Sequence, residues 1–153
     1  MSRYIFLFDL DSTVTKQEIL PTISKKLGIY EKMSELTEST MRGEVPFKQS
    51  FLQRVDLLKN VPVSEVNEMV SKIQLNNHLV DFIRVNHDRC YIVTGNLDVW
   101  IDGLIRKIGM ERNTFCSKAI VKNDYIEDVF NIVDKNAVIG QMVLPFVAIG
   151  DGN

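Results

Sequence analysis

Three apolar segments of this chain each end in a cluster of polar residues. The clusters are Asp9-Leu10-Asp11-Ser12-Thr13, Thr94-Gly95-Asn96 and Gly150-Asp151-Gly152-Asn153. Each cluster on its own is typical of a turn, because Asp, Asn, Ser and Gly are common turn residues. All three clusters follow strand-like segments, however. Their shared position at the ends of strands favours one common site over three separate turns.

The residue types in these clusters predict phosphoryl chemistry assisted by a metal ion. Asp9 and Asp11 stand two residues apart, and Asp151 supplies a third carboxylate. Clustered hard oxygen ligands suit Mg²⁺, and a divalent cation also relieves repulsion between neighbouring carboxylates. Thr94 offers a hydroxyl and Gly95 an accessible backbone N–H, both of which can hold a phosphoryl oxygen. We therefore expect a small phosphorylated ligand.

Phosphoryl transfer also needs a cation for the charge on the transferred group. Lys135 stands at the start of an expected short helix just before the last apolar segment, and it is the candidate. A lone lysine on a helix usually faces solvent. Lys135 is proposed only because it stands just before the last apolar segment, beside the expected site.

The apolar segments indicate a sheet that is covered on both faces. They occupy residues 4–8, 91–93, 115–121 and 146–149 and lack the polar alternation of a one-sided sheet. Continuous apolar strands are typical of parallel α/β sheets. Ligands of such sheets lie at the carboxyl ends of the strands, so the three polar clusters should converge.

Helical periodicity fills most of the chain between these strands. Expected helices cover residues 19–27, 31–41, 47–58, 64–73, 76–83 and 97–108. Gly28 and Gly109 should end two of them, and Asn76 or Asn77 should cap one. Residues 122–124 are typical of a hairpin turn. The layout predicts an α/β core at 1–15 and 75–153, with a small helical cap inserted at 16–74.

Bulk composition narrows the class of partner. The chain has 153 residues, 45% apolar and 25% charged, with a formal net charge of −2. Without a basic excess we expect no nucleic-acid partner, and without a long apolar run no membrane partner. No signal peptide is recognisable, which favours a cytoplasmic location. Cys90 and Cys116 lack metal-site spacing and are expected to be buried free thiols rather than a disulfide or metal pair.

The ordered motifs resemble those of haloacid dehalogenase superfamily phosphatases. Asp9-Leu10-Asp11-Ser12-Thr13-Val14 is similar to their first motif, in the form found in phosphoserine phosphatases. Thr94-Gly95-Asn96, Lys135 and Gly150-Asp151-Gly152-Asn153 stand where the family has its second, third and fourth motifs. Residues 41–55 also resemble the family's cap helices. The resemblance spans the chain and implies a Rossmann-like core with a helical-bundle cap.

This resemblance implies hydrolysis of a phosphomonoester in two steps. Asp9 would attack phosphorus and form an aspartyl-phosphate, and Asp11 would protonate the leaving oxygen and then deprotonate water. Mg²⁺ would be held by Asp9, Asp151 and the backbone carbonyl of Asp11. The other phosphoryl oxygens would be held by Thr94, Gly95 and Lys135.

Three cap residues stand where phosphoserine phosphatases recognise their substrate. Glu18 would bind the amino group, Arg54 the carboxylate, and Phe47 matches a cap aromatic. Glu18 is equally explained as part of a capping box beginning at Thr15. Arg54 could extend its charge to solvent along an apolar helix face, and Phe47 could simply be a core residue.

The sequence departs from the family in two places. Asn96 replaces a glycine of the second motif, which should alter the substrate pocket. The chain also ends at Asn153, inside the fourth motif, so we expect a C-terminally truncated member with an open sheet edge that favours self-association. The leading function is a Mg²⁺-dependent phosphatase for a phosphoserine-like metabolite. The alternatives are a phosphotransferase with the same intermediate, or a non-catalytic remnant that binds a phosphorylated ligand or a partner.

Overall fold

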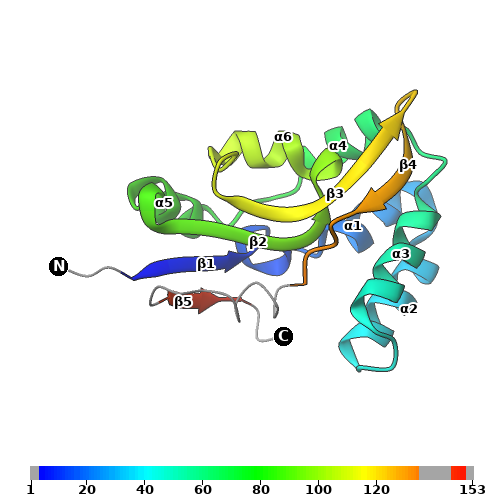
Figure 1. Cartoon of the computed structure of the whole chain (residues 1–153), viewed down its shortest axis with the longest axis horizontal. Coiled ribbons are helices and arrows are strands. Elements are labelled where there is room, and N and C mark those ends of the chain that lie inside the picture. The colour runs from blue at the N-terminus through cyan, green and yellow to red at the C-terminus, as the bar shows by residue number, and fades with distance from the viewer. Residues whose placement is uncertain (1–3, 135–145, 151–153) are drawn as a thin grey trace.

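A computed structural model describes residues 4–134 and 146–150 of the chain. Its centre is a five-stranded sheet in the order β4-β3-β2-β1-β5 (Figure 1). The strands are β1 (Ile5–Asp9), β2 (Cys90–Leu97), β3 (Thr114–Lys122), β4 (Tyr125–Phe130) and β5 (Phe146–Ile149). All neighbouring strands pair in parallel except β3 and β4, which are antiparallel. The expected parallel α/β sheet is confirmed.

Both faces of the sheet are covered by apolar side chains, which explains the continuous apolar runs. Phe8 of β1 is buried in the main core, whereas its neighbours Ile5 and Leu7 belong to a second cluster with Val93. Successive strand residues point to opposite faces, so an apolar residue at every position requires cover on both sides. Helices α5 (Asn77–Val85) and α6 (Asp98–Ile108) lie over the main-core face (Figure 1).

Four helices are inserted between β1 and α5. They are α1 (Ile19–Leu27), α2 (Tyr30–Met41), α3 (Phe47–Leu57) and α4 (Val63–Ser71). Figure 1 shows α2 and α3 projecting beyond the carboxyl ends of the parallel strands. Gly28 and Gly109 end α1 and α6 in left-handed conformations with φ of 75° and 74°, as their sequence positions predict. Asn76 occupies the N-cap position of α5, but its side chain makes no capping hydrogen bond.

The segment that leads from the sheet into the inserted helices lies beside the segment that leads back to the sheet. Thr15 and Leu75 form an antiparallel bridge, Lys16 N–H donates to the Gln74 carbonyl at 2.9 Å, and Asn76 N–H donates to the Val14 carbonyl at 2.8 Å. This short two-stranded neck joins the inserted helices to the sheet directly behind the polar cluster that follows β1.

Helix α4 is hydrogen-bonded to the core at two points, near its start and at its middle. At its start, Ser64 N–H donates to Oδ1 of Asp124 at 3.1 Å, and Asp124 lies in the turn between β3 and β4. Further along, the side chain of Asn67 donates to the Val99 carbonyl and accepts from Gly103 N–H, both in α6. The β3–β4 turn expected at residues 122–124 is confirmed. No helix within residues 4–134 and 146–150 is long and apolar enough to cross a membrane.

Candidate active site

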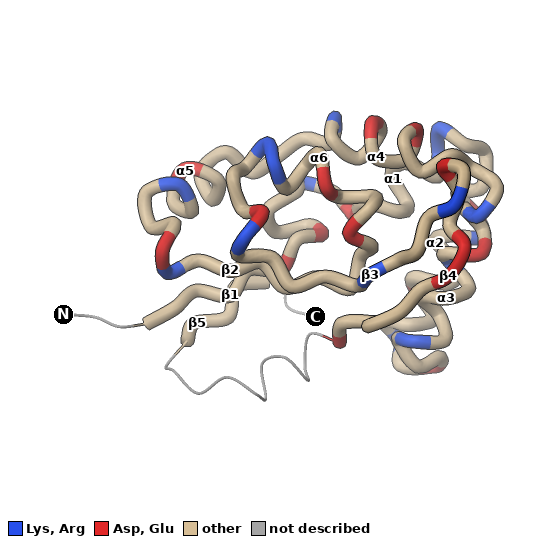
Figure 2. Tube along the Cα trace, turned by 45° about the horizontal axis from the view of Figure 1, so that its top comes forward, with Lys and Arg blue, Asp and Glu red and all other residues tan. Residues whose placement is uncertain are grey.

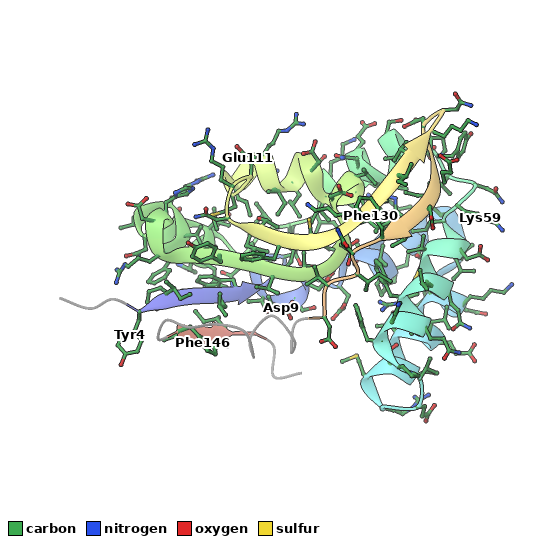
Figure 3. All side chains as sticks on the ribbon, viewed as in Figure 1. Tyr4, Asp9, Lys59, Glu111, Phe130 and Phe146 are labelled. Carbon is green, nitrogen blue, oxygen red and sulfur yellow. The ribbon has the colours of Figure 1, made fainter. Side chains whose placement is uncertain are left out.

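Asp9 is the last residue of β1 and lies beside the end of β5. Its Oδ1 accepts a hydrogen bond from the Leu10 backbone N–H at 2.9 Å, which fixes one carboxylate oxygen. A Cβ placed on Gly150 would lie 3.7 Å from the Asp9 Cβ and 3.9 Å from its Oδ2. The register pairs Phe8 with Ile149, so the next residues, Asp9 and Gly150, lie side by side. Figure 3 labels Asp9 at the end of β1. The first residue of the last polar cluster, Gly150, therefore lies beside the first cluster at this sheet edge.

A tight turn over Leu10–Val14 carries Asp11 away from the strand. Ser12 adopts a left-handed conformation with φ of 58°, which is unfavourable for most residues other than glycine. The hydroxyl of Thr15 stabilises the turn, since it accepts from Ser12 N–H at 3.1 Å and donates to backbone carbonyls. The turn presents Asp11 to the inserted helices, and Oδ1 of Asp11 accepts from Ile19 N–H at 2.7 Å.

The carboxyl group of Asp11 has a strongly raised pKa. Packing around the carboxylate removes it from bulk water and, together with the charges of Glu18 and Asp9, raises the pKa of Asp11 to about 7. The hydrogen bond from Ile19 and the charge of Arg54 act in the opposite direction. One side of Asp11 still faces the pocket described below. A carboxyl group with this pKa can both give and take a proton near neutral pH.

The second polar cluster forms a bulge in β2. Val93 pairs with Phe115 and Leu97 with Ser117, so the three residues of Thr94-Gly95-Asn96 oppose Cys116 alone. Such bulges re-aim side chains and often lie beside active sites. We expected β2 to end before this cluster, but the strand continues to Leu97. The hydroxyl of Thr94, only 2% exposed, accepts from Asn96 N–H at 3.1 Å, so its own proton can be donated elsewhere.

Helix α3 places two aromatic rings and one cation over this bulge. The rings of Phe47 and Phe51 stack at 5.6 Å with an interplanar angle of 11°. The Arg54 guanidinium lies 5.8 Å and 5.7 Å from their respective centroids. A Cβ on Gly95 would lie 2.3 Å from Cζ of Phe47, so only glycine admits the ring in this position. The inserted helices thus close directly onto the bulge.

Nε of the Arg54 guanidinium is withdrawn from solvent. This nitrogen has no hydrogen-bond partner among the described residues. Burial lowers the pKa of Arg54, while the charges of Asp11 and Glu18 act to raise it. An arginine that extended its charge into water would keep its polar atoms hydrated. The buried Nε therefore favours a ligand-binding interpretation of Arg54 over simple extension to solvent.

These residues surround one pocket between the sheet and the inserted helices. Its described lining is Asp11, Glu18, Leu20, Pro21, Phe47, Phe51, Arg54, Gly95 and Asn96. The pocket brings together six of the site residues expected from the sequence, although their roles remain predictions. Leu20, Pro21 and Phe51 were not singled out as site residues. The spacing of Phe47, Phe51 and Arg54 on one helical face was the available signal for Phe51.

Glu18 does not form the capping box that the sequence allowed. Helix α1 begins at Ile19, so Glu18 takes the N-cap position itself and makes no side-chain capping bond. Instead the Ser12 hydroxyl donates to Oε1 of Glu18 at 3.4 Å, and Asp11 caps Ile19 from the preceding turn. A capping box would need Thr15 at the helix start, but its hydroxyl is engaged in the turn.

Comparison with known proteins agrees with this geometry, although no family model matches the chain. A phosphoserine phosphatase of Methanocaldococcus jannaschii is 28% identical over 165 residues, covering 98% of this chain and 78% of the relative. A phosphoserine phosphatase of Archaeoglobus fulgidus is 33% identical over 112 residues. That match covers 71% of this chain, and the chain spans only 33% of that relative's length.

Solved structures point the same way. A phosphoserine phosphatase carrying an analogue of the phospho-aspartyl intermediate shares 26% identity and a TM-score of 0.75, covering 99% of this chain and 79% of that one. This chain is a relative of phosphoserine phosphatases and has their haloacid dehalogenase fold. A substrate-bound phosphoserine phosphatase, at 24% identity and a TM-score of 0.73, shares the fold.

The metal site implied by the superfamily can be tested on the described residues only in part. Asp9 fits a divalent cation chemically, because Leu10 holds one carboxylate oxygen and the other lies towards Gly150 at the sheet edge. Asp151, the next expected ligand, and Lys135, the expected phosphoryl cation, lie outside the described residues. Within the described part of the chain, no three acidic, histidine or cysteine side chains form a complete metal cluster.

The side chain of Asp11 is directed to another task. Its Oδ1 is bonded to Ile19, and the residue lines the pocket with Glu18 and Arg54. If Asp11 takes part in metal binding, the backbone carbonyl is therefore the better candidate, which leaves the carboxyl group for proton transfer.

Proposed function

We propose that this chain is a phosphomonoester hydrolase that acts through an aspartyl-phosphate on a small phosphoserine-like metabolite. One observation carries the proposal: Asp11, a carboxyl group of pKa about 7 that follows the nucleophile candidate Asp9 by two residues, lines one pocket together with Glu18 and Arg54. A nucleophile, a proton donor and two opposite charges for an amphoteric leaving group are thus supplied together.

In the first step, Oδ2 of Asp9 attacks phosphorus, and the bond between phosphorus and the ester oxygen breaks. Asp11, in its protonated form, gives its proton to that leaving oxygen. The hydroxyl of Thr94 donates to a phosphoryl oxygen. Lys135 is proposed for a further phosphoryl oxygen on the strength of the family resemblance alone. The products of this step are an alcohol and an acyl phosphate on Asp9.

In the second step, water attacks the acyl phosphate, and Asp11, now a carboxylate, takes a proton from it. Inorganic phosphate leaves, and both aspartates return to their starting protonation states. Bound Mg²⁺, held by Asp9, Asp151 and the Asp11 carbonyl, would neutralise charge on the phosphoryl group.

The inserted helices would keep bulk water away from the first step. We propose the core at residues 1–15 and 75–153 and the cap at 16–74, because the neck pairs Thr15 with Leu75. The contact of Phe47 with Gly95 corresponds to a closed cap. Charges of both signs are interspersed along the helices, so substrate attraction depends on the pocket itself (Figure 2). The cytoplasmic location and self-association through a sheet edge remain predictions.

The deciding experiment is release of inorganic phosphate from O-phospho-L-serine in Mg²⁺, with Asp9→Asn as the matched inactive variant. We expect turnover by the natural sequence and none by Asp9→Asn. Phosphate appearing on added alcohol instead of in solution would indicate the phosphotransferase alternative. Binding of phosphoserine without any turnover would contradict the hydrolase and favour the non-catalytic binding protein.

A further inference from the structure

Asn96 stands where the superfamily's phosphoserine phosphatases have glycine. It is the last residue of the bulge in β2, is 5% exposed, and lines the pocket together with Asp11 and Arg54. A buried polar side chain in a pocket requires hydrogen-bond partners, because burying an unpaired amide is costly.

The orientation of the Asn96 amide follows from its local hydrogen bond. Its Oδ1 accepts from the backbone N–H of Leu97 at 3.0 Å. The reversed amide would bring an NH₂ group against that N–H, so the observed assignment is the favoured one. One lone pair of Oδ1 is therefore used, and among the described residues no acceptor is found for the two protons of Nδ2. The side chain offers two donors to a ligand, besides one further lone pair on Oδ1.

The pocket that Asn96 lines is on the leaving-group side of the site. Its described lining includes Arg54 from α3 and Asp11, which in the proposed mechanism would protonate the leaving oxygen. Asp9 and Thr94, which would contact the phosphoryl group, are not among the described residues that line it. A donor here meets the organic part of the substrate before it meets the phosphate.

A second donor in the same pocket also lacks an acceptor. Nε of Arg54 is buried without a hydrogen-bond partner in the described part of the chain. Two donors without an acceptor among the described residues, the buried Nε of Arg54 and Nδ2 of Asn96, match a group with two acceptor oxygens and a negative charge. A carboxylate has this chemistry, and hydrogen bonds to it would satisfy both donors.

We propose that Asn96 is a specificity-determining residue whose Nδ2 donates to a carboxylate oxygen of the leaving group, beside Arg54. The site would then select phosphate esters of amino or hydroxy acids over esters that lack a carboxylate. This inference rests on the proposed function, and it assigns to Asn96 a role that glycine at the same position could not perform.

The test compares two ligands that differ only by the carboxylate, O-phospho-L-serine and O-phosphoethanolamine. Binding is measured by calorimetry in Mg²⁺ on Asp9→Asn protein, so that neither ligand is hydrolysed. Asn96→Asp is the informative variant, because it keeps the acceptor for Leu97 but replaces the donor with an anionic oxygen. Asn60→Asp adds the same charge at an exposed position and serves as the control.

We expect Asn96→Asp to reduce the preference for phosphoserine over phosphoethanolamine by about 10- to 100-fold, as for loss of a hydrogen bond to a charged group. Asn60→Asp should leave the preference unchanged. An unchanged preference in Asn96→Asp, or equal weakening of both ligands, would overturn the inference. Failure of phosphoserine to bind the parent protein would overturn it as well.

Turnover separates this inference from the proposed function. If the natural sequence releases no phosphate, but Asn96→Asp still loses carboxylate preference in binding, the hydrolase proposal fails and the assignment of Asn96 stands. If phosphate is released and the preference does not respond to Asn96, only the assignment of Asn96 fails. Thermal unfolding of each variant verifies that the bulge remains folded.

Discussion

Oδ1 of Asp11 accepts a hydrogen bond of 2.7 Å from the backbone N–H of Ile19, the first residue of α1. The proton-transfer candidate of the core is thereby fastened to the first helix of the insert. The N-terminus of a helix favours an anion, and this contact opposes the effect of burial on the Asp11 pKa. Burial and the charge of Glu18 nevertheless prevail. The position of this carboxyl group and its protonation are therefore both set by residues of the inserted segment.

Ionisation of Asp11 should destabilise the metal-free protein. Its pKa rises from 3.8 to about 7 on folding, so the folded state binds the proton more tightly than the unfolded state. The stabilisation is fully present below about pH 4 and is lost as the pH rises to 7. In EDTA at pH 8, Asp11→Asn should be more stable than the natural sequence by roughly 2–4 kcal/mol, the lower value allowing for solvent in the pocket.

Urea unfolding in EDTA from pH 4 to pH 8 measures this difference. Asp81→Asn, a change at an exposed aspartate of α5, is the matched control and should follow the natural sequence throughout. Parallel stability curves for Asp11→Asn and the natural sequence would contradict the raised pKa. Because Asn cannot exchange a proton, Asp11→Asn should also lose turnover, which separates stability from activity at one residue.

A methyl group at Gly95 should disturb closure of the inserted helices. Its Cβ would lie 2.3 Å from Cζ of Phe47, and the ring must move to relieve the overlap. We expect Gly95→Ala to lower kcat/KM for phosphoserine about tenfold or more, since small displacements at a reacting site are costly. Gly95→Ala combined with Phe47→Leu should recover part of the loss, because the shorter side chain removes the clash.

Gly103 supplies a control of the same kind away from the pocket. A Cβ there would lie 2.6 Å from Oδ1 of Asn67, in the contact between α4 and α6. Gly103→Ala should therefore lower stability and leave the KM for phosphoserine unchanged. Equal kinetic effects of the two alanine substitutions would contradict a specific contact between Gly95 and Phe47.

Binding of phosphoserine should weaken when the planar guanidinium of Arg54 is replaced, even if the positive charge is kept. The guanidinium lies over two aromatic rings and has an unpaired buried Nε, a geometry that an ammonium cannot reproduce. We expect Arg54→Lys to raise the KM for phosphoserine by about 10- to 100-fold, and Arg54→Met to raise it further. With phosphoethanolamine, which has no carboxylate, both effects should be much smaller. Equal effects on the two substrates would exclude carboxylate binding by Arg54.

Much of the fold could be predicted because it depends on local patterns. The continuous apolar run ending at Asp9 required a sheet covered on both faces, and Gly28 and Gly109 gave two helix ends. The turn at residues 122–124 was readable from residue types alone. In each case the signal lies within a few residues of the feature that it determines.

The remaining features depend on contacts between distant segments. The bulge at Thr94-Gly95-Asn96 is defined by its pairing with β3, and the first N–H of α1 is capped by the side chain of Asp11 from the preceding turn. Neither has a sequence pattern of its own. The sequence did name most residues of the pocket as candidates, because polar residues after apolar strands are informative, but it could not show which of them face the leaving group.

The two thiols should be chemically inert in the folded protein. Cys90 and Cys116 are buried and free, as expected from the sequence. Burial raises the pKa of Cys90 to about 11 and also raises that of Cys116, so little thiolate exists at pH 8. We expect no fast reaction with a disulfide reagent at pH 8 and two equivalents of reaction after unfolding in urea. A fast equivalent in the native state would show that one strand opens locally.

Asp124 should contribute to stability as a cap supplied from outside the helix. It lies in the β3–β4 turn with φ of 67°, and its carboxylate accepts from Ser64 at the start of α4. Asp124→Gly removes the capping carboxylate and introduces a residue that adopts positive φ without strain. A change in the free energy of unfolding can then be assigned to the lost cap. We expect a loss of about 1 kcal/mol in the free energy of unfolding by urea, typical of a lost N-cap.

Asn123→Gly is the matched substitution, since Asn123 shares the turn with φ of 53° and makes no capping contact with α4 in the described structure. Its stability should stay close to that of the natural sequence. Equal stability of Asp124→Gly and Asn123→Gly would contradict the capping role. A loss confined to Asp124→Gly, with KM for phosphoserine unchanged, would show that the hairpin anchors α4 without shaping the pocket, because Asp124 contacts the start of α4 and no residue of the described lining.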